Sequence, residues 1–166
     1  MSLSFGGGSR HLLLPHPWST SSVPSVSLKH LDINGCKNLT HMPCRLGKLT
    51  SLQTLTLFVV SKGLVNSSER CDGLIELNKL NDLREKINII NLAWVKDATS
   101  EFKAANLKEK QYLSELELRW NPEGNDGAIA CDDKNSTYSL KPPESLKSLV
   151  MDGYMGVRFS SWFNKI

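Results

Sequence analysis

The chain lacks the features that mark several functional classes. No apolar run approaches the roughly 18 residues of a membrane-spanning helix, so we expect no membrane span. The 20 basic and 17 acidic side chains leave a formal charge of only +3, without a Lys or Arg block, so we do not expect nucleic acid as a partner. The chain has only four cysteines among 166 residues. So few do not indicate a disulfide scaffold and favour a reduced, intracellular setting.

Motifs for catalysis and nucleotide binding are missing as well. The sequence has neither a G-x-S-x-G nucleophile motif nor a Gly-x-x-x-x-Gly-Lys-Ser/Thr phosphate loop. The run Gly6–Gly8 is not followed by Lys-Ser/Thr, and Gly47-Lys48 is followed by Leu49. We therefore predict that the chain is not an enzyme, has no catalytic residues and binds no cofactor, because the nucleotide-binding module is absent.

Two side-chain groupings resemble chemical sites without completing one. Cys36, His41 and Cys44 have a C-x4-H-x2-C spacing, but structural zinc needs four ligands and no convincing fourth lies nearby, so we predict no metal site. Glu115 and Glu117 are two residues apart, which places their side chains about 7 Å apart on one strand face, as in an acid–base pair. An open sheet leaves such carboxylates hydrated, so we interpret them as a solvated charged face.

What the chain does contain is a repeated apolar pattern. The unit is an apolar residue, two variable residues, an apolar residue, one variable residue and another apolar residue. Copies of this unit start at Leu28, Leu52, Arg84, Leu113 and Leu146, and the third copy fits the pattern least closely. Successive starts are 24, 32, 29 and 33 residues apart. Five copies near one period predict a leucine-rich-repeat solenoid, an α/β fold with a curved parallel β-sheet and helical or irregular return segments. We expect about five repeats, without a recognisable cap at either end.

The segments between the units predict local structure. Asp97 can cap a helix that runs without Gly or Pro to Leu113, and Gly73 to Leu83 is typical of a second, shorter helix. Three positions beyond each final apolar residue, we expect a side chain to turn inward and satisfy buried backbone. These positions are occupied by Cys36, Val60, Leu92, Asn121 and Tyr154.

The domain organisation follows from composition. Residues 1–22, rich in Gly, Ser and Pro, predict a disordered leader, and residues 23–166 form the leucine-rich-repeat domain. Within this domain, residues 121–141 are polar and predict a mobile loop. Three N-x-S/T sequons argue for secretion, but the apolar run Leu12–Leu14 ends at a proline and is too short for a signal peptide.

Residues 28–60, LKHLDINGCKNLTHMPCRLGKLTSLQTLTLFVV, resemble the repeats of plant nucleotide-binding leucine-rich-repeat disease-resistance proteins. The motifs that begin at Gly73, Leu116 and Gly153 are similar to the same family, and the resemblance covers about residues 23–166. The chain departs from the family at residues 159–162, where Phe-Ser-Ser-Trp replaces Phe-Pro-x-Trp, which should loosen that turn. Because the nucleotide-binding module and the caps are missing, a fragment is the simplest interpretation.

The resemblance implies a cytoplasmic immune receptor whose repeats sense pathogen effectors or guarded host proteins and hold a nucleotide switch off. Partners would then be proteins: an effector, a host guardee or the receptor's own nucleotide-binding domain. The alternative is a truncated or stand-alone adaptor or decoy that has no switch of its own.

The predicted binding surface is the concave sheet face, to which the variable strand residues point. Four of its members are acidic and two basic, and this net charge of −2 favours a basic partner. We expect three apolar members, Phe58, Ile90 and Val150, to act as anchors, although an ordinary solvated sheet is an open alternative. Reversing the charges of Glu115 and Glu117 together should weaken binding and leave folding intact. The face comprises His30, Asp32, Asn34, Thr54, Thr56, Phe58, Lys86, Asn88, Ile90, Glu115, Glu117, Arg119, Ser148, Val150 and Asp152.

Overall fold

The structure, a computed structural model, describes residues 27–61, 73–95, 97–120, 139–154 and 162. The predicted leader, residues 1–22, and most of the predicted loop at 121–141 lie outside the described residues. The strands are β1 (His30–Leu31), β2 (Thr54–Leu55), β3 (Leu57–Val59), β4 (Arg84–Ile90), β5 (Tyr112–Arg119) and β6 (Ser148–Asp152). The helical segments are η1 (Leu46–Lys48), η2 (Leu74–Leu77), η3 (Leu92–Trp94), α1 (Ala98–Ala105) and η4 (Leu107–Glu109).

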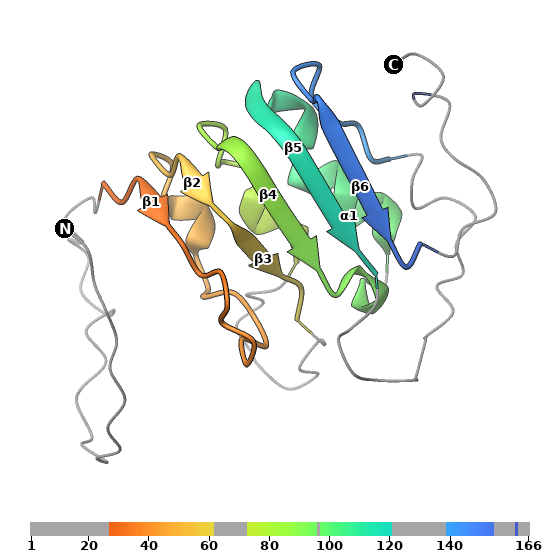
Figure 1. Cartoon of the computed structure of the whole chain (residues 1–166), viewed down its shortest axis with the longest axis horizontal. Coiled ribbons are helices and arrows are strands. Elements are labelled where there is room, and N and C mark those ends of the chain that lie inside the picture. Colours follow the sequence, from red (N-terminus) through yellow and green to blue (C-terminus); the bar gives the residue numbers. More distant parts are fainter. Residues whose placement is uncertain (1–26, 62–72, 96, 121–138, 155–161, 163–166) are drawn as a thin grey trace.

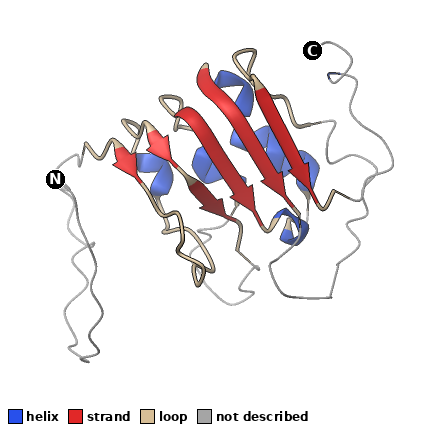
Figure 2. Cartoon of the chain, in the orientation of Figure 1, coloured by secondary structure: helices blue, strands red, loops and turns tan. Residues whose placement is uncertain are grey.

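All strand pairs are parallel and follow chain order. Strands β1 and β2 form one pair, and β3-β4-β5-β6 form a four-stranded sheet. A parallel connection needs a crossover, and here the return segments supply it on one face of the sheet (Figures 1 and 2). The prediction of an α/β fold with a parallel sheet and helical or irregular returns is confirmed. None of the helices in the described residues has the length and apolarity needed to span a membrane.

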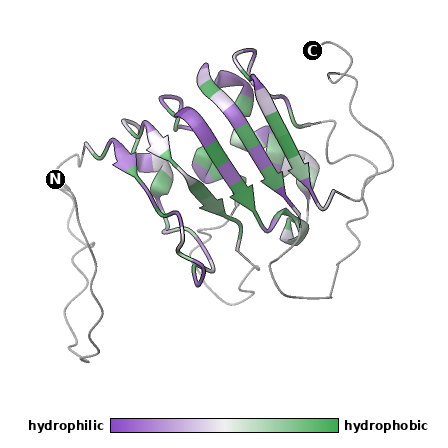
Figure 3. Cartoon of the chain, viewed as in Figure 1, coloured by the Kyte–Doolittle hydropathy of each residue, from purple (hydrophilic) through white to green (hydrophobic). Residues whose placement is uncertain are grey.

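The core lies between the sheet and the return segments. Hydrophobic and hydrophilic residues alternate along most of β5, whereas β4 begins with polar residues and the middle of β6 is apolar (Figure 3). The inward residues Ile87 and Ile89 of β4 and Leu116 and Leu118 of β5 are at most 1% exposed. Trp120 is buried, and its ring packs edge-on against Tyr154 with the centroids 5.0 Å apart. Trp94 and Trp162 are half-buried.

The return helices are shorter than predicted. Asp97 caps α1 as expected, since its carboxylate accepts a hydrogen bond from Ser100 N at 3.1 Å, and the bonds from Ser100 lower the pKa of Asp97. The helix does not continue to Leu113, because Asn106 has a φ of 50° and is left-handed. The predicted second helix contracts to the single turn η2, although its apolar stripe is fully buried; the stripe consists of Leu74, Leu77 and Leu80.

The inward-turning positions follow the prediction only in part. Val60 and Leu92 are buried and Tyr154 is half-buried. Cys36 is exposed and free, so the prediction that it turns inward is wrong. Its turn, with Gly35 at a φ of 81°, has an exposed surface and leaves no buried backbone for the thiol to satisfy. Asn121 lies outside the described residues.

Adjacent return segments are linked by carboxylates. Glu76 in η2 accepts hydrogen bonds from Gly47 N at 2.7 Å and Arg45 N at 3.3 Å, at the start of η1. Glu101 in α1 likewise accepts one from Leu74 N, the first residue of η2, at 2.8 Å. Each carboxylate therefore satisfies amide groups that a helical turn leaves without partners, and it stabilises the preceding return segment.

Lys110 is the most deeply buried charged residue described. Its side chain is fully buried, and Nζ donates hydrogen bonds to Leu77 O at 2.7 Å and to Asn81 Oδ1 at 3.4 Å. Leu77 is the last residue of η2, so the Lys110 amine binds a carbonyl at the carboxyl end of this turn. Glu101 binds the amide at its amino end. Burial lowers the pKa of Lys110 to about 8, because the charged form loses hydration.

Replacing Glu76 with Ala should destabilise the fold by about 1.5–3 kcal/mol, because two amide groups at η1 lose a charged acceptor. The matched control is Glu109→Ala, since Glu109 makes only an exposed ion pair with Lys108 at 3.5 Å and should change stability by less than about 0.5 kcal/mol. Urea unfolding of both variants measures the difference. Equal costs would show that the carboxylate link at η1 contributes nothing.

The stability of the protein should rise with pH between about 8 and 10, because Lys110 binds its proton less tightly in the folded chain than in the unfolded chain. From pH 7.5 to 9.5, this group should add about 1–2 kcal/mol to the free energy of unfolding. Lys110→Met lacks the titrating amine and should lack this increment. Urea unfolding at both pH values checks the prediction, and parallel pH dependences in the two proteins would contradict it.

Candidate functional site

The candidate site is the open face, defined here as the sheet face opposite the return segments. Alternate strand residues point to it, and strand register places them in cross-strand rows. One row contains Lys86, Glu115 and Ser148; the next contains Leu57, Asn88, Glu117 and Val150; the last contains the pairs Val59–Ile90 and Arg119–Asp152.

The predicted face residues differ widely in exposure. Most are accessible, as a binding surface requires. His30, Asp32, Asn34, Lys86, Glu115, Ser148, Val150 and Asp152 are exposed, and Thr54, Thr56, Asn88, Ile90 and Arg119 are half-buried. Only two of the predicted members, Glu117 and Phe58, are buried.

Phe58 is not on the open face, so its predicted position is wrong. It lies opposite Ile89 in the register of β3 and β4, and it is 2% exposed within the core. The cause is an interruption at Thr56 between β2 and β3, which puts two residues instead of one between the buried side chains of Leu55 and Phe58. Leu57, predicted to be buried, therefore takes the open-face position opposite Asn88 and is half-buried.

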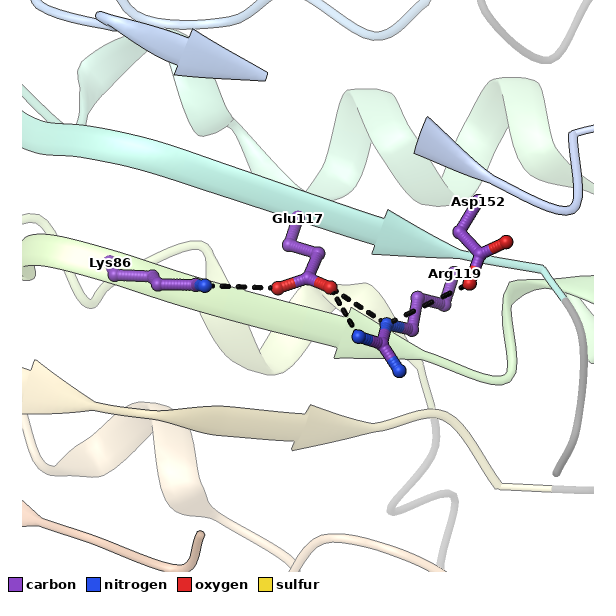
Figure 4. A network of polar contacts seen from close by, with 4 residues as sticks. All are labelled: Lys86, Glu117, Arg119 and Asp152. Carbon is purple, nitrogen blue, oxygen red and sulfur yellow. Dashed lines mark hydrogen bonds and ion pairs between the residues drawn. The ribbon is translucent and has the colours of Figure 1, made fainter. Parts of the chain in front are cut away.

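The centre of the open face is a cluster of ion pairs (Figure 4). Glu117 projects between two cations: Oε2 is 3.1 Å from Lys86 Nζ, and Oε1 accepts hydrogen bonds from Arg119 Nη2 at 2.6 Å and Nε at 2.8 Å. Arg119 Nε also lies 4.0 Å from Asp152 Oδ2. Glu117 is 8% exposed, whereas its partners are more accessible. The cluster joins β4, β5 and β6.

The two cations keep Glu117 ionised. Burial alone would raise the pKa of this carboxyl, but the hydrogen bonds and charges of Arg119 and Lys86 outweigh burial and lower it. Glu115, by contrast, is exposed. A pair of catalytic carboxylates needs one group that remains protonated near neutral pH, and this arrangement favours the charged form of Glu117.

Within the open face, these contacts pair some of the charged side chains with each other. The cluster holds two cations and two carboxylates, so the predicted excess of two negative charges falls on Asp32 and Glu115. The Asp32 carboxylate accepts hydrogen bonds from Asn34 N and the Thr56 hydroxyl, both at 2.9 Å, and these bonds lower its pKa. Asp32 and Glu115 are therefore the exposed acids of the face that lie outside the ion-pair cluster.

The disulfide bond at Cys44 differs from the expectation of reduced thiols. Cys44 is disulfide-bonded, whereas Cys36 is a free thiol. The bond at Cys44 removes one sulfur from the C-x4-H-x2-C grouping considered above. Among the residues that the structure describes, no group of three or more His, Cys, Asp or Glu side chains could hold a metal ion.

A parallel sheet with one polar face and helical returns on the other is the architecture of a leucine-rich-repeat region. Residues 74–166, more than half of the chain, match the family of R13L1/DRL21 leucine-rich repeats. The chain belongs to this family of leucine-rich repeats. No solved structure matches it significantly.

Relatives of the chain are plant disease-resistance proteins, as the resemblance in the sequence implied. The candidate disease resistance protein RGA4 of Solanum bulbocastanum is 38% identical over 137 residues, which cover 81% of this chain and 13% of that protein. The candidate disease resistance protein At3g14460 of Arabidopsis thaliana is 36% identical over 118 residues, or 68% of this chain and 8% of that protein. Disease resistance protein RGA2 of Solanum bulbocastanum is also 36% identical over 118 residues, which cover 71% of this chain and 11% of that protein. The chain spans about an eighth of the length of RGA4.

Charge reversal should destabilise the fold much more at position 117 than at position 115. Glu117→Lys brings a third cation between Lys86 and Arg119 and should cost about 3 kcal/mol or more. Glu115→Lys changes an exposed position and should cost less than about 0.5 kcal/mol. In place of the expectation that reversing both charges leaves folding intact, we therefore predict that the double reversal destabilises the fold. Urea unfolding of the two single variants is the test, and a similar small effect in both would show that the cluster does not stabilise the sheet.

Proposed function

We propose that this chain is the protein-recognition region of a plant immune receptor and that it binds its partner through the open face. The region is a non-enzymatic, curved solenoid of about five repeats within a cytoplasmic receptor. The observation that carries the proposal is the open face itself, a surface of polar and apolar side chains across the parallel strands opposite the returns (Figure 2). The relatives named as disease-resistance proteins support the immune context.

Electrostatics favour a partner with a basic surface. Glu115 on strand β5 and Asp32 beside strand β1 are exposed acids that are not members of the neutral ion cluster. Complementary charge accelerates association and orients the partner, while apolar contacts supply most of the affinity. Val150, 48% exposed, and Ile90, half-buried, are apolar members of the face that a partner could cover.

Three kinds of protein fit this surface within the receptor proposal. A pathogen effector or a guarded host protein would make the face a sensor. The receptor's own nucleotide-binding domain would make it an autoinhibitory contact, so that an effector competes for the same surface. In each case the partner shifts the equilibrium of the nucleotide switch, because it binds the open face more tightly in one state of the receptor than in the other.

Changing the charge of the open face should alter receptor signalling. Glu115→Lys combined with Asp32→Asn adds three charge units and keeps an acceptor at Asp32 for Asn34 and Thr56. In the receptor that contains this chain, we expect the pair either to abolish the response to the recognised effector or to raise the resting response. Cell-death assays in leaves, with receptor abundance measured by immunoblot, provide the measurement.

The matched control changes charge on the return side, with Lys79→Glu and Lys108→Glu, both at exposed positions. These variants should leave both resting and triggered responses unchanged. Unchanged signalling by the open-face variants at normal abundance would remove this face from the recognition mechanism.

A further inference from the structure

Cys44 is the disulfide-bonded cysteine of a return segment that also contains a free thiol. It lies at an exposed position shortly before η1, and Cys36, exposed in the same connection between β1 and β2, is free. The second sulfur of the bond therefore belongs to Cys71 or Cys131, the other two cysteines of the sequence, which lie outside the described residues. Cys36 serves as a matched reference for the bonded sulfur of Cys44.

The disulfide is attached to the start of η1, which Glu76 of the next return segment also holds. Glu76 accepts hydrogen bonds from Arg45 N at 3.3 Å and from Gly47 N at 2.7 Å. Arg45 has a φ of 67°, a left-handed conformation that is unfavourable for a residue with a Cβ atom. The disulfide before Arg45 and the Glu76 bonds at and after it restrain this residue from both sides. Loss of the disulfide should therefore let this turn open more often.

The bond is accessible to external thiols. Thiol–disulfide exchange requires that a thiolate reach one of the two sulfurs, and Cys44 is exposed. Exposed disulfides are reduced more readily than structural ones, and disulfides in cytosolic proteins are usually transient or redox-sensing. In a cytoplasmic receptor this bond would therefore respond to the thiol pool instead of acting as a permanent brace.

We propose that Cys44 is a redox-sensitive site, whose disulfide holds η1 against η2 and whose reduction releases the start of η1. Glutathione is the reductant: one glutathione thiolate attacks a sulfur of the bond and forms a mixed disulfide, and a second one displaces the cysteine as glutathione disulfide. The protein disulfide gains two electrons and two protons and becomes two thiols, while two glutathione molecules lose them. Glutathione disulfide reverses the reaction. The inference rests on the cytoplasmic location in the proposed function, and it adds regulation behind the repeat that carries Asp32.

The first experiment measures whether the bond is reversible in glutathione buffers. The full 166-residue chain is equilibrated over a series of ratios of reduced to oxidised glutathione, its thiols are trapped by alkylation, and its peptides are identified by mass spectrometry. We expect Cys44 to be mostly bonded to a second cysteine at oxidising ratios and mostly alkylated at the reducing ratios of the cytosol. The mass of the cross-linked peptide identifies that second cysteine.

The second experiment measures whether the bond holds η1. Amide hydrogen exchange, followed by ¹H–¹⁵N NMR, compares equivalent amides at the ends of two turns. Leu49 N donates to Leu46 O in η1, and Lys110 N donates to Leu107 O in η4. Reduction should accelerate the exchange of Leu49 and Gly47 about tenfold or more, because η1 opens locally, and should change the exchange of Lys110 less than about twofold.

Variants assign the response to one sulfur. Cys44→Ser cannot form the bond, so its η1 amides should exchange at the fast rate in both oxidising and reducing buffers. Cys36→Ser is the matched control and should respond to the buffer as the parent chain does. Both redox states of the parent chain are measured directly, so a folding defect in either variant leaves the inference testable.

A bond that persists in the most reducing buffer would overturn the inference, as would Cys44 bonded to glutathione instead of to a second cysteine. Equal exchange of Leu49 in the two states would also overturn it. Equal acceleration of Leu49 and Lys110 would show that reduction loosens the whole chain and would reject the release of η1.

None of these results depends on the signalling assay, in which charge changes at Glu115 and Asp32 test the open face. Altered signalling together with an unresponsive Cys44 would reject the redox site alone. Unchanged signalling together with a responsive Cys44 would reject only recognition through the open face.

Discussion

The structure depends on the burial of inward apolar side chains in a continuous stack across neighbouring strands. Ile87 and Ile89 of β4 lie in register with Leu116 and Leu118 of β5, and all four are almost completely buried. No single strand could bury its apolar side alone, so each segment of the chain is stabilised by the next one along the sheet. The carboxylates of Glu76 and Glu101 add directional bonds between the return segments behind the sheet.

This separation of the two sheet faces explains how the fold can support recognition. Inward positions are restricted to apolar residues, whereas outward positions are free to carry charge without disturbing the core. The Glu117 cluster is an exception, because its buried carboxylate is held by Lys86 and Arg119 and contributes to the cohesion of β4 and β5. The acids that a partner can reach are consequently Asp32 and Glu115, together with the more weakly paired Asp152.

The repeated pattern predicted the architecture because its apolar positions report burial directly. Strands β4, β5 and β6, the cap at Asp97 and the buried stripe of η2 all follow from residue spacing. The pattern misplaced Phe58, because an interruption at Thr56 shifts the register by one residue and has no marker in the local sequence. It also overextended α1, although Asn106 belongs to a residue type that often ends helices in the left-handed conformation.

The membership of the open face was largely predictable, whereas its interactions were not. Alternation along a strand identifies which residues share a face, but the contacts among Lys86, Glu117 and Arg119 depend on the register between strands. The same holds for Lys110, a charged residue whose full burial follows from tertiary packing against Leu77. The burial of the side-chain oxygen of Asn88, which has no hydrogen-bond partner, likewise depends on the packing of the neighbouring strands.

Site-specific photo-crosslinking tests most directly whether the open face is the recognition surface. A photoreactive amino acid placed at Glu115 and, separately, at Lys79 on the return side would be irradiated in plant cells that express the proposed receptor. The account predicts that position 115 crosslinks to a protein or to another domain of the receptor, that Glu115 and Asp32 variants change this product, and that position 79 gives no such product. Crosslinking from position 79 with none from position 115 would contradict recognition through the open face.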